Sequence, residues 1–416
     1  MKNIYASIIT IGDELLIGQV IDTNSAWMAQ QLNKIGIAVK KRIAIGDDAQ
    51  EMRQALDVES QEADLVLLTG GLGPTSDDIT KDFLCKYFNG KMVVNEAALE
   101  NVKYLFEKIY KKPVSQVNLL QAEVPDVCEV VQNKRGSAPG MIFKRNNTIF
   151  VSMPGVPYEM QGIMNELIPY LQKQFELPSI FHRTILTAGI GESALAEVIA
   201  DFERHLPEEI RLAYLPNYGM VRLRLTTLGF DKEATQKIID EQFDQLKSLV
   251  KKYMVTDKDE TMQEVLGKLL LKNNKTISTA ESCTGGMIAS LLTSIAGSSG
   301  YYNGSIVSYS CEIKETLLHV KKDTLNNYGA VSEQTVIEML DGLLNKLNTD
   351  YGIAVSGIMG PDGGTAEKPV GTVWIAAGNK EKHVTQKIQQ RFERAKNIEV
   401  TSVMALNIMR KFILEE

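Results

Sequence analysis

The stretch Asp64-Leu-Val-Leu-Leu-Thr-Gly-Gly-Leu-Gly-Pro-Thr-Ser-Asp-Asp78 determines the fold that we expect for the first part of the chain. Its apolar half has the composition of a buried strand, and its glycine-rich half leads into a helical pattern over Ile79–Phe88. A chain that alternates strands and helices in this way forms a parallel sheet with helices on both faces, a three-layer α/β domain. The same alternation precedes this stretch, with strand, helix, strand and helix patterns at Tyr5–Ile11, Ser25–Ile35, Ala38–Ile45 and Gln50–Val58.

Two loops in this region combine glycines with carboxylates. Gly12–Gly18 and Gly70–Asp78 both follow strands, so both should lie at the carboxyl edge of the sheet, where such folds bind ligands. Glycines let the backbone approach phosphate oxygens, and Mg²⁺ is held by carboxylates together with substrate phosphates. Alternatively, Asp77 and Asp78 only complement the dipole of the following helix. The candidate metal ligands or general bases for attack on a phosphoanhydride are Asp13, Glu14, Asp77 and Asp78.

The size and charge of the chain limit the classes of protein to which it can belong. Its 416 residues suggest two or three domains, and 44% hydrophobic with 23% charged residues is typical of a soluble globular protein. The net charge of −7 argues against broad binding of nucleic acids. Four scattered cysteines indicate free thiols in a reducing compartment. Because neither a signal peptide nor a membrane span is recognisable, we expect a cytoplasmic protein that does not bind membranes.

The remainder of the chain predicts two further domains. After a strand at Thr148–Met153, the pattern changes near residues 177–181 to that of a small α+β unit. A polar linker at Thr256–Glu260 precedes a third unit, which again alternates strands and helices from Thr261–Leu271 onwards. The predicted domains are therefore residues 1–175, 176–255 and 256–416. The elements expected in the α+β unit are His182–Ala188, Ser193–His205, Val221–Thr227 and Ile238–Tyr253.

The third unit contains an unusual concentration of hydroxyl, thiol and carboxylate groups in Thr279-Ala-Glu-Ser-Cys-Thr-Gly-Gly286. A strand pattern precedes this stretch and a helical pattern follows from Met287, so the stretch is expected to form a strand-to-helix turn. Such a turn can expose one side chain beside free backbone N–H groups. A simpler interpretation is a helix N-cap, which needs one hydroxyl, and Thr284 is suitably placed. The cap leaves the other reactive groups unexplained.

A serine in this turn would need a base to act as a nucleophile. The four histidines, at positions 182, 205, 319 and 383, lie outside glycine-rich stretches, which disfavours a Ser–His system and leaves a Cys283–His pair as a minor alternative. A lysine with a lowered pKa remains. The stretch Gly304-Ser-Ile-Val-Ser-Tyr-Ser-Cys-Glu-Ile-Lys314 runs as a strand into a helix, and Tyr309 and Lys314 lie near the junction.

Motifs of the N-terminal part resemble the CinA family, named for competence/damage-inducible protein A. They are Ile11-Gly-Asp-Glu-Leu-Leu-x-Gly18, Asp22-Thr-Asn-Ser25, Thr69–Asp78 and Met153-Pro-Gly-Val-Pro157. The resemblance implies a molybdopterin-binding-like domain that cleaves ADP-ribose to AMP and ribose 5-phosphate and depends on a divalent metal (Mg, Mn or Co) and on K⁺. It implies Asp77 and Asp78 as catalytic residues and Asp13, Glu14, Asp77 and Asp78 as metal ligands. The implied substrate-binding residues are Gly12, Asn24, Ser25, Gly70, Gly71, Gly73, Thr75 and Gly155.

Motifs of the third unit are similar to the C-terminal domain of the same family. They include Thr279–Gly286, Tyr309-Ser-x-x-x-Lys314, Ser356-Gly-Ile-x-Gly-Pro-x-Gly-Gly364 and Lys368–Trp374. The resemblance implies a cofactor-free Ser/Lys amidase that converts nicotinamide mononucleotide to nicotinate mononucleotide and ammonia. Ser282 would be its nucleophile and Lys314 its base, with Tyr309 bonded into the pair. The implied substrate-binding residues are Glu281, Cys283, Thr284, Gly285, Gly286, Gly357, Gly360, Gly363, Gly364 and Arg394.

The chain departs from the family pattern at two positions and matches it thinly in the middle. Phe392 stands where glycine is usual, which puts the conformation of the loop before Arg394 in doubt. Cys311 stands where asparagine is common, and neither change touches the proposed set of Ser282, Lys314 and Tyr309. The middle unit resembles the family's KH-like domain, but the acidic balance of the chain favours solvated or ion-paired roles for Arg222 and Arg224 over nucleic-acid binding. A homodimer is implied by the family alone.

The leading hypothesis is a bifunctional hydrolase of pyridine-nucleotide salvage, with nicotinamide mononucleotide and ADP-ribose as its two substrates. The alternative is a non-catalytic protein that binds a nucleotide or molybdopterin in competence or the DNA-damage response. Because a pocket for molybdopterin would need the same glycines as a pocket for ADP-ribose, the alternative stays open for the N-terminal half.

Overall fold

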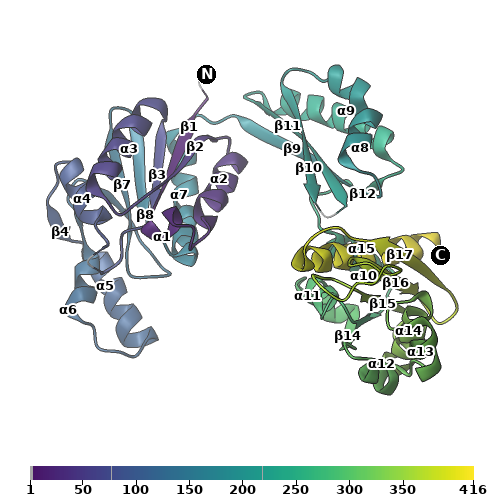
Figure 1. The fold of residues 1–416 in the computed structure, drawn as a ribbon. Helices are drawn as coiled ribbons and strands as arrows, with labels where there is room; N and C mark the ends of the chain where they lie inside the picture. The colour runs from purple at the N-terminus through teal and green to yellow at the C-terminus, as the bar shows by residue number, and fades with distance from the viewer. Residues whose placement is uncertain (1–2, 76, 218) are drawn as a thin grey trace. The chain divides into compact units, whose positions relative to one another are not determined.

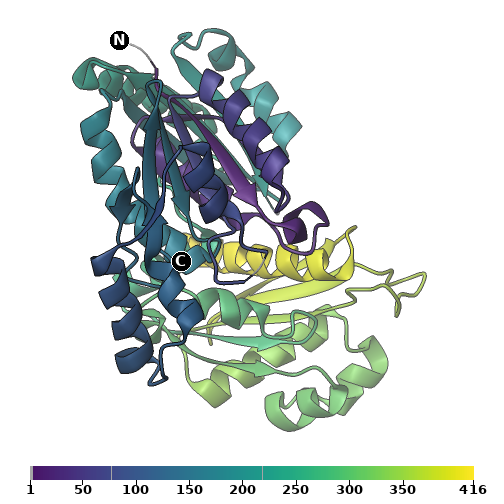
Figure 2. The ribbon, with the colours of Figure 1, turned by 90° about the vertical axis from the view of Figure 1, so that its left-hand side faces the viewer.

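A computed structural model describes residues 3–75, 77–217 and 219–416. Ser76, which belongs to the predicted Gly70–Asp78 loop, lies outside the described residues. The chain divides into two compact units, Met1–Phe181 with Thr227–Ile238 and His182–Thr226 with Ile239–Glu416 (Figures 1 and 2). No helix in the described part of the chain is long and apolar enough to cross a membrane.

The first unit is built around a six-stranded sheet, with the strand order β2-β1-β3-β8-β7-β6 (Figure 1). The four strands β2 (Ala38–Ile45), β1 (Tyr5–Ile11), β3 (Leu65–Thr69) and β8 (Thr148–Met153) are parallel. Every residue of β3 and β8 is buried, as expected for strands covered on both faces. The strands β7 (Gly140–Arg145) and β6 (Glu129–Val131) extend the sheet antiparallel. The predicted parallel sheet is confirmed.

Helices cover both faces of this sheet and form two separate cores. On one face, α3 (Ala49–Glu62) and α4 (Thr80–Tyr87) bury Met52, Leu56, Phe83 and Leu84 against the strands. On the other face, α2 (Thr23–Lys34) and α7 (Pro157–Gln174) bury residues such as Met28 and Met160. The three-layer architecture is therefore confirmed. The short helix α1 (Asp13–Leu16) follows β1.

An excursion between α4 and β6 was not predicted from the sequence. It consists of β4 (Met92–Val94), α5 (Glu96–Tyr104), the π-helical turn η1 (Leu105–Ile109), α6 (Gln116–Leu119), the 3₁₀ turn η2 (Leu120–Ala122) and β5 (Glu123–Pro125). The strands β4 and β5 pair with each other in a separate two-stranded sheet. The turn η2 is important for the site because it carries Gln121 into the cavity described below.

The middle of the chain forms a small four-stranded sheet with the order β10-β11-β9-β12. Its strands are β9 (Ser179–Ala188), β10 (Ile210–Asn217), β11 (Met220–Gly229) and β12 (Met254–Thr256), and its helices are α8 (Glu192–Arg204) and α9 (Lys232–Val250). The α+β prediction is confirmed, although β10 and β12 were not foreseen. The last helix begins at Lys232 and ends at Val250, earlier at both ends than predicted.

The C-terminal sheet has the order β14-β13-β15-β16-β17 (Figure 1). The strands β14 (Tyr302–Val307), β13 (Ile277–Glu281) and β15 (Tyr351–Gly357) are parallel, whereas β16 (Thr372–Gly378) and β17 (His383–Gln389) run antiparallel. One face carries α10 (Met262–Lys272), α11 (Met287–Thr293) and α15 (Arg394–Glu415). The other face carries α12 (Cys311–Leu318), α13 (Lys322–Tyr328) and α14 (Glu333–Leu347). The 3₁₀ turn η3 (Ser298–Gly300) lies between α11 and β14.

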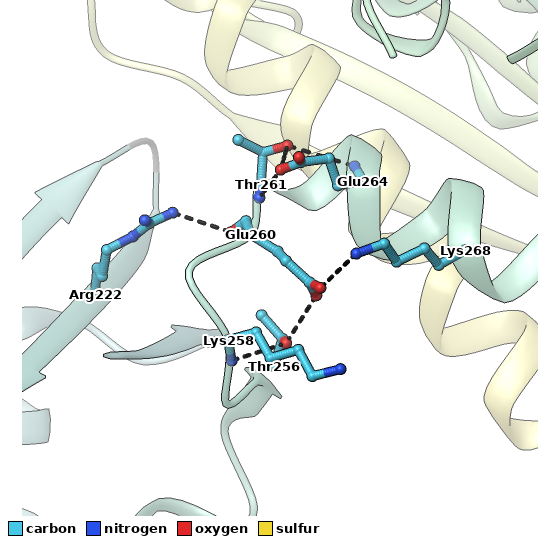
Figure 3. A network of polar contacts seen from close by, with 7 residues as sticks. All are labelled: Arg222, Thr256, Lys258, Glu260, Thr261, Glu264 and Lys268. Atoms are coloured by element: carbon cyan, nitrogen blue, oxygen red, sulfur yellow. Dashed lines mark hydrogen bonds and ion pairs between the residues drawn. The ribbon is translucent and has the colours of Figure 1, made fainter. Parts of the chain in front are cut away.

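A polar network joins the small sheet to the start of α10 (Figure 3). The Arg222 guanidinium pairs with Asp259 and donates to the backbone oxygen of Glu260 at 3.0 Å. The Glu260 carboxylate accepts from the Lys268 ammonium at 2.6 Å and from the Thr256 hydroxyl at 3.1 Å. The predicted linker is thus an ordered connection, and Arg222 has the ion-paired role that the sequence favoured. Thr261 caps α10 in a capping box with Glu264, which fixes where the helix begins.

Candidate active sites

Ser282 lies in the turn between β13 and α11, at the carboxyl edge of the C-terminal sheet. The backbone N–H of Ser282 donates to the backbone oxygen of Val355 at 3.0 Å, and the backbone oxygen of Ser282 accepts from the N–H of Gly285 at 3.2 Å. Gly285 and Gly286 have φ values of 63° and 100°, which side chains disfavour, so glycine is required for this turn. The side chain of Ser282 is held in a tight strand-to-helix turn and is only 7% exposed.

The amine of Lys314 reaches Ser282 from α12. Its Nζ lies 3.0 Å from Ser282 Oγ, 2.7 Å from the backbone oxygen of Ser308 and 3.3 Å from that of Tyr309. The side chain is 1% exposed, and this burial lowers the pKa of the Lys314 amine because the charged form loses its hydration. A neutral amine has two N–H groups and one lone pair. With both carbonyls accepting, the lone pair is left to face the Ser282 hydroxyl.

Cys283 is the alternative nucleophile in the same turn. It is 5% exposed and belongs to the apolar core of this domain. Burial raises the pKa of its thiol to about 12, so the thiol stays protonated at neutral pH. Because the thiolate is the nucleophilic form of cysteine, this environment disfavours the Cys–His alternative.

The carboxylate of Glu281 caps α11 from inside the domain. Its Oε2 accepts from the N–H groups of Gly286 and Ile288, both at 3.0 Å, and its Oε1 accepts from the N–H of Ala289 at 2.8 Å. The Thr284 hydroxyl donates to the same carboxylate at 2.7 Å. The expected cap on Thr284 is therefore wrong, because Thr284 is a donor to the group that caps the helix. The N–H of Gly286 is already used and cannot bind an oxyanion.

Two backbone N–H groups of the turn remain available. Within the described residues, no hydrogen bond uses the N–H of Cys283 or the N–H of Thr284, the two residues that follow Ser282. Backbone N–H groups directly after a nucleophile are the usual donors of an oxyanion hole. Of the backbone N–H groups of Cys283–Gly286 that were expected to bind an oxyanion, only those of Cys283 and Thr284 therefore remain as candidates.

Glu281 provides a prediction about stability that is separate from catalysis. Glu281→Gln is expected to lower the free energy of unfolding by about 2–4 kcal/mol, because an amide nitrogen would face buried N–H donors that need an acceptor. The readout is the shift of the urea denaturation midpoint. Glu312→Gln, on the exposed surface of α12, is the matched control and should shift it little. An unchanged midpoint for Glu281→Gln would contradict the capping role.

Tyr309 and Arg394 form a second layer beside the pair. The Tyr309 side chain is 64% exposed, and its hydroxyl accepts from Arg394 Nη2 at 3.2 Å. Arg394 Nη1 donates to the backbone oxygen of Gly360 at 2.7 Å. Tyr309 is bonded to the Ser–Lys pair as expected, through its backbone carbonyl, which accepts from the Lys314 amine, while its hydroxyl contacts Arg394. Arg394 connects Tyr309 to the glycine-rich loop.

The glycines of the 357–364 loop serve the backbone itself. Gly360 and Gly363 have φ values of 84° and 90°. A Cβ at Gly357 would lie 2.9 Å from the backbone oxygen of Thr372, and one at Gly364 would lie 2.6 Å from the N of Val370. Part of the glycine content is therefore explained by the turn and its close packing. This loop places the oxygen of Gly360 where Arg394 can reach it.

Asn397, which sequence reasoning missed, holds this region together. It is fully buried, and its Nδ2 donates to the backbone oxygens of Met359 at 3.1 Å and Phe392 at 2.8 Å. Its Oδ1 accepts from the N–H of Phe392 at 3.1 Å. Phe392 is not among the residues with positive φ, so the missing glycine costs the loop nothing at this position. The signal in the sequence was an asparagine on the buried face of the first turn of α15.

The first unit has a cavity of about 390 Å³ at the carboxyl ends of β1, β3 and β8. This is the sheet edge where the two glycine-containing loops were expected to meet. Ile11, Gln121, Ser137 and Glu159 also line the cavity, and sequence reasoning had not assigned them to a site. The predicted site residues that the structure brings together in its wall are Gly12, Glu14, Gly70, Gly71, Gly73, Asp77, Asp78 and Gly155.

A smaller cavity of about 110 Å³ shares Ile11, Glu14 and Gly155 with the larger one. Asn24 lines it and donates through Nδ2 to the backbone oxygen of Gly155 at 2.7 Å and to the Thr69 hydroxyl at 3.3 Å. Its Oδ1 is buried and has no hydrogen-bond partner among the described residues. The side chain of Asn24 is therefore fixed by its Nδ2 contacts, while its Oδ1 is an unused acceptor.

Three predicted site residues have structural contacts instead. Asp13 Oδ1 accepts from the N–H of Asp47 at 3.3 Å. Ser25 is fully buried, and its hydroxyl accepts from Arg42 Nε at 2.8 Å. The Thr75 hydroxyl donates to Asp78. None of the three is in the wall of the larger cavity. Asp78 lines that cavity but also ties down the loop through the Thr75 N–H at 3.0 Å.

The family of the chain follows from comparison with known proteins. Residues 259–413 match the CinA C-terminal domain, residues 7–173 match the probable molybdopterin binding domain, and residues 182–256 match the damage-inducible protein CinA KH domain. A CinA-like protein of Cytophaga hutchinsonii is 47% identical over 99% of this chain and 99% of its own length. The chain belongs to the CinA family.

One further relative matches over the full length and one solved structure matches over part of the chain. A putative competence-damage inducible protein of Acetivibrio thermocellus is 38% identical over 99% of both chains. The solved structure of a CinA superfamily protein from Klebsiella pneumoniae 700603 is 31% identical, with a TM-score of 0.37, and covers 38% of this chain and 100% of that chain. The family models and the two full-length relatives confirm the family resemblance that the sequence motifs carried.

In this CinA chain, Asp47 is the carboxylate that sequence reasoning missed. It follows β2, the strand beside β1, and lines the larger cavity. Burial, together with the charges of Asp13, Glu14 and Asp77, raises the pKa of the Asp47 carboxyl. The acidic pair Asp47–Asp48 directly after a predicted strand was the signal, and it resembled the loops that were noticed.

The donor set of this CinA cavity suits a shared cation site. Among residues 3–75, 77–217 and 219–416, no three carboxylate, imidazole or thiol side chains converge closely enough to hold a metal ion by themselves. Glu14, Asp47 and Asp77 all line this cavity, and the charges of Glu14 and Asp77 add to the effect of burial in raising the pKa of the Asp47 carboxyl. A divalent cation in this position would take its remaining oxygens from substrate phosphates, as Mg²⁺ commonly does. The residues fit such a cation.

Proposed function

We propose that the C-terminal domain hydrolyses the carboxamide of nicotinamide mononucleotide to nicotinate mononucleotide and ammonia. The observation that carries this proposal is the buried contact of 3.0 Å between Lys314 Nζ and Ser282 Oγ. A serine hydroxyl needs a nearby base, and a desolvated amine of lowered pKa can supply one at a lower pH than an ordinary lysine. The comparisons support CinA membership and do not by themselves supply this activity.

The amidase reaction proceeds in two steps. The neutral Lys314 amine takes the proton of Ser282 as Oγ attacks the amide carbon, and the N–H groups of Cys283 and Thr284 donate to the developing oxyanion. Lys314 then passes its proton to the leaving nitrogen, so that ammonia departs and an ester forms on Ser282. Water attacks the ester, Lys314 takes its proton, and Ser282 recovers a proton as nicotinate mononucleotide leaves.

Arg394 is the proposed ligand of the substrate phosphate. Its two known contacts, to Gly360 and Tyr309, use one N–H of each terminal nitrogen. A guanidinium has five N–H groups, so donors remain for a phosphate. The exposed Tyr309 side chain therefore orients Arg394 and takes no part in proton transfer.

We further propose that the N-terminal domain cleaves the diphosphate of ADP-ribose, with AMP and ribose 5-phosphate as products. Glycine backbone at Gly70–Gly73 would approach the diphosphate, while one or two of the carboxylates Glu14, Asp47 and Asp77 would hold a divalent cation together with the phosphates. The cation, when bound, would neutralise phosphate charge.

The K⁺ requirement and a homodimer are proposed from the family resemblance alone. A pocket that only binds a nucleotide or molybdopterin would use the same glycines and is the second candidate.

Removal of divalent metal separates the two activities. A chelator is expected to abolish ADP-ribose cleavage and to leave ammonia release from nicotinamide mononucleotide unchanged, because carboxylates line the N-terminal cavity, whereas the Ser282–Lys314 pair supplies a nucleophile and a base without a cation. Asp77→Asn should lower ADP-ribose cleavage by about 10²-fold or more. Asp82→Asn, on α4, is the control outside the cavity wall. Metal-independent cleavage, or ADP-ribose binding without any cleavage, would contradict the hydrolase proposal.

A further inference from the structure

Gln121 is a buried polar side chain for which the fold provides no partner. It lies in η2, is 3% exposed, and lines the larger N-terminal cavity. Its Oε1 is buried without a hydrogen-bond partner in the described part of the chain. Buried carboxamides in folded proteins normally have their hydrogen bonds satisfied, so an unpaired one in a cavity wall indicates a missing ligand.

A second unpaired carboxamide oxygen lies in the adjoining cavity. Asn24 Oδ1 is buried and unpartnered among the described residues, while Asn24 Nδ2 is anchored on Gly155. The two cavities, of about 390 Å³ and 110 Å³, share Ile11, Glu14 and Gly155 in their walls. A large and a small cavity therefore lie side by side, and each has an unpaired acceptor on a residue of its wall.

We infer that Gln121 is a specificity-determining residue that recognises the adenine of the substrate by accepting a hydrogen bond from its exocyclic amino group. This inference rests on the proposed function of the N-terminal domain. ADP-ribose has a central diphosphate with a large adenosine arm and a small ribose arm. The larger cavity, which contains Gln121, suits the adenosine, and the smaller one, which contains Asn24, suits the terminal ribose.

The chemistry of a glutamine side chain favours adenine as the partner of Gln121. A carboxamide presents an acceptor and a donor side by side, and adenine presents the complementary amino group and ring nitrogen. Hypoxanthine has a carbonyl oxygen in place of the amino group, so in the side-chain orientation of the structure it would face Oε1 with another acceptor, and a matched pair would require the carboxamide to turn over. A ribose hydroxyl could also donate to Oε1, but it would not distinguish the two bases.

The test compares ADP-ribose with its inosine analogue in the full-length protein. Wild type is expected to prefer ADP-ribose by about tenfold in kcat/KM, the size of a good base contact. Gln121→Met, which keeps the size of the side chain, should lose about tenfold with ADP-ribose and change little with the analogue. Gln116→Met, on the exposed surface of α6, is the matched control. Equal losses with both substrates, or no preference in wild type, would overturn the inference.

Two further measurements separate this inference from the proposed hydrolase activity. Unchanged turnover of the inosine analogue checks that the N-terminal domain of Gln121→Met is folded, and the preference of wild type needs no variant at all. If wild type cleaves neither compound, the hydrolase proposal fails, and calorimetric binding of ADP-ribose to wild type and Gln121→Met decides the inference. Weaker binding by the variant would support it, whereas no binding by wild type, or equal binding, would overturn it.

Discussion

Ser282→Ala is expected to abolish ammonia release from nicotinamide mononucleotide while ADP-ribose cleavage continues at the wild-type rate. Without the hydroxyl no acyl-enzyme can form, and loss of a nucleophile typically lowers turnover by about 10³-fold or more. Ser282 lies in the C-terminal sheet domain, whereas the carboxylate-lined cavity belongs to the first unit. The measurement is a pair of assays, ammonia from one substrate and AMP from the other, on the same preparation.

A matched serine supports the interpretation of this variant. Ser290 is exposed on α11, a few residues from the turn, and Ser290→Ala should leave both activities unchanged. Loss of both activities in Ser282→Ala would contradict the two-site account, and so would ammonia release that survives at the wild-type rate.

Replacing Lys314 should have an effect of similar size, and the choice of substitute reveals the role of the amine. Lys314→Met and Lys314→Arg are both expected to lower amidase turnover by about 10³-fold. Methionine has no lone pair of comparable basicity, and arginine keeps its proton at all accessible pH values. A role for Lys314 as a mere positive charge would predict that arginine restores activity.

The pH dependence of wild type follows from the same residue. Burial lowers the pKa of the Lys314 amine, and the amine acts as a base only in its neutral form. Amidase kcat/KM should therefore rise with pH and reach its plateau well below 10.5, the ordinary pKa of lysine. A rise that continues up to the ordinary lysine pKa would contradict the proposed environment of this amine.

Stability distinguishes loss of the base from loss of the fold. A lysine of lowered pKa binds fewer protons in the folded state than in the unfolded state, so its contribution to the free energy of unfolding rises with pH between the folded pKa and 10.5. Lys314→Met removes this cost at neutral pH. The variant should be at least as stable as wild type although it is inactive, an exchange of stability for activity that is common in catalytic sites.

The sequence predicted those parts of the fold that depend on local patterns. The four parallel strands of the first sheet and the turn at Ser282 were expected within a residue or two, because burial on both faces gives continuous apolar runs. The excursion that contains η2 was missed. Its strands have three residues each, and such short elements carry too little periodicity to be recognised.

The sites were predicted less completely, for reasons that differ from residue to residue. Glu281 was expected to contact substrate, but it caps α11 across a turn of unusual length, which the common pattern of a cap three residues before its donor does not reveal. Tyr309 was expected to be bonded to the Ser–Lys pair, and the structure adds that the contact is made by its backbone carbonyl. Asp47 and Gln121 reach the cavity only through the tertiary arrangement of β2 and η2. Spacing along the chain cannot show such contacts.

The measurement that tests the central claim most directly is ammonia release when purified wild-type protein is incubated with nicotinamide mononucleotide in the presence of a chelator. The account predicts steady release at the same rate as without the chelator, because the Lys314 amine and the Ser282 hydroxyl supply the base and the nucleophile themselves. Absence of ammonia, or release that disappears with the chelator, would contradict it.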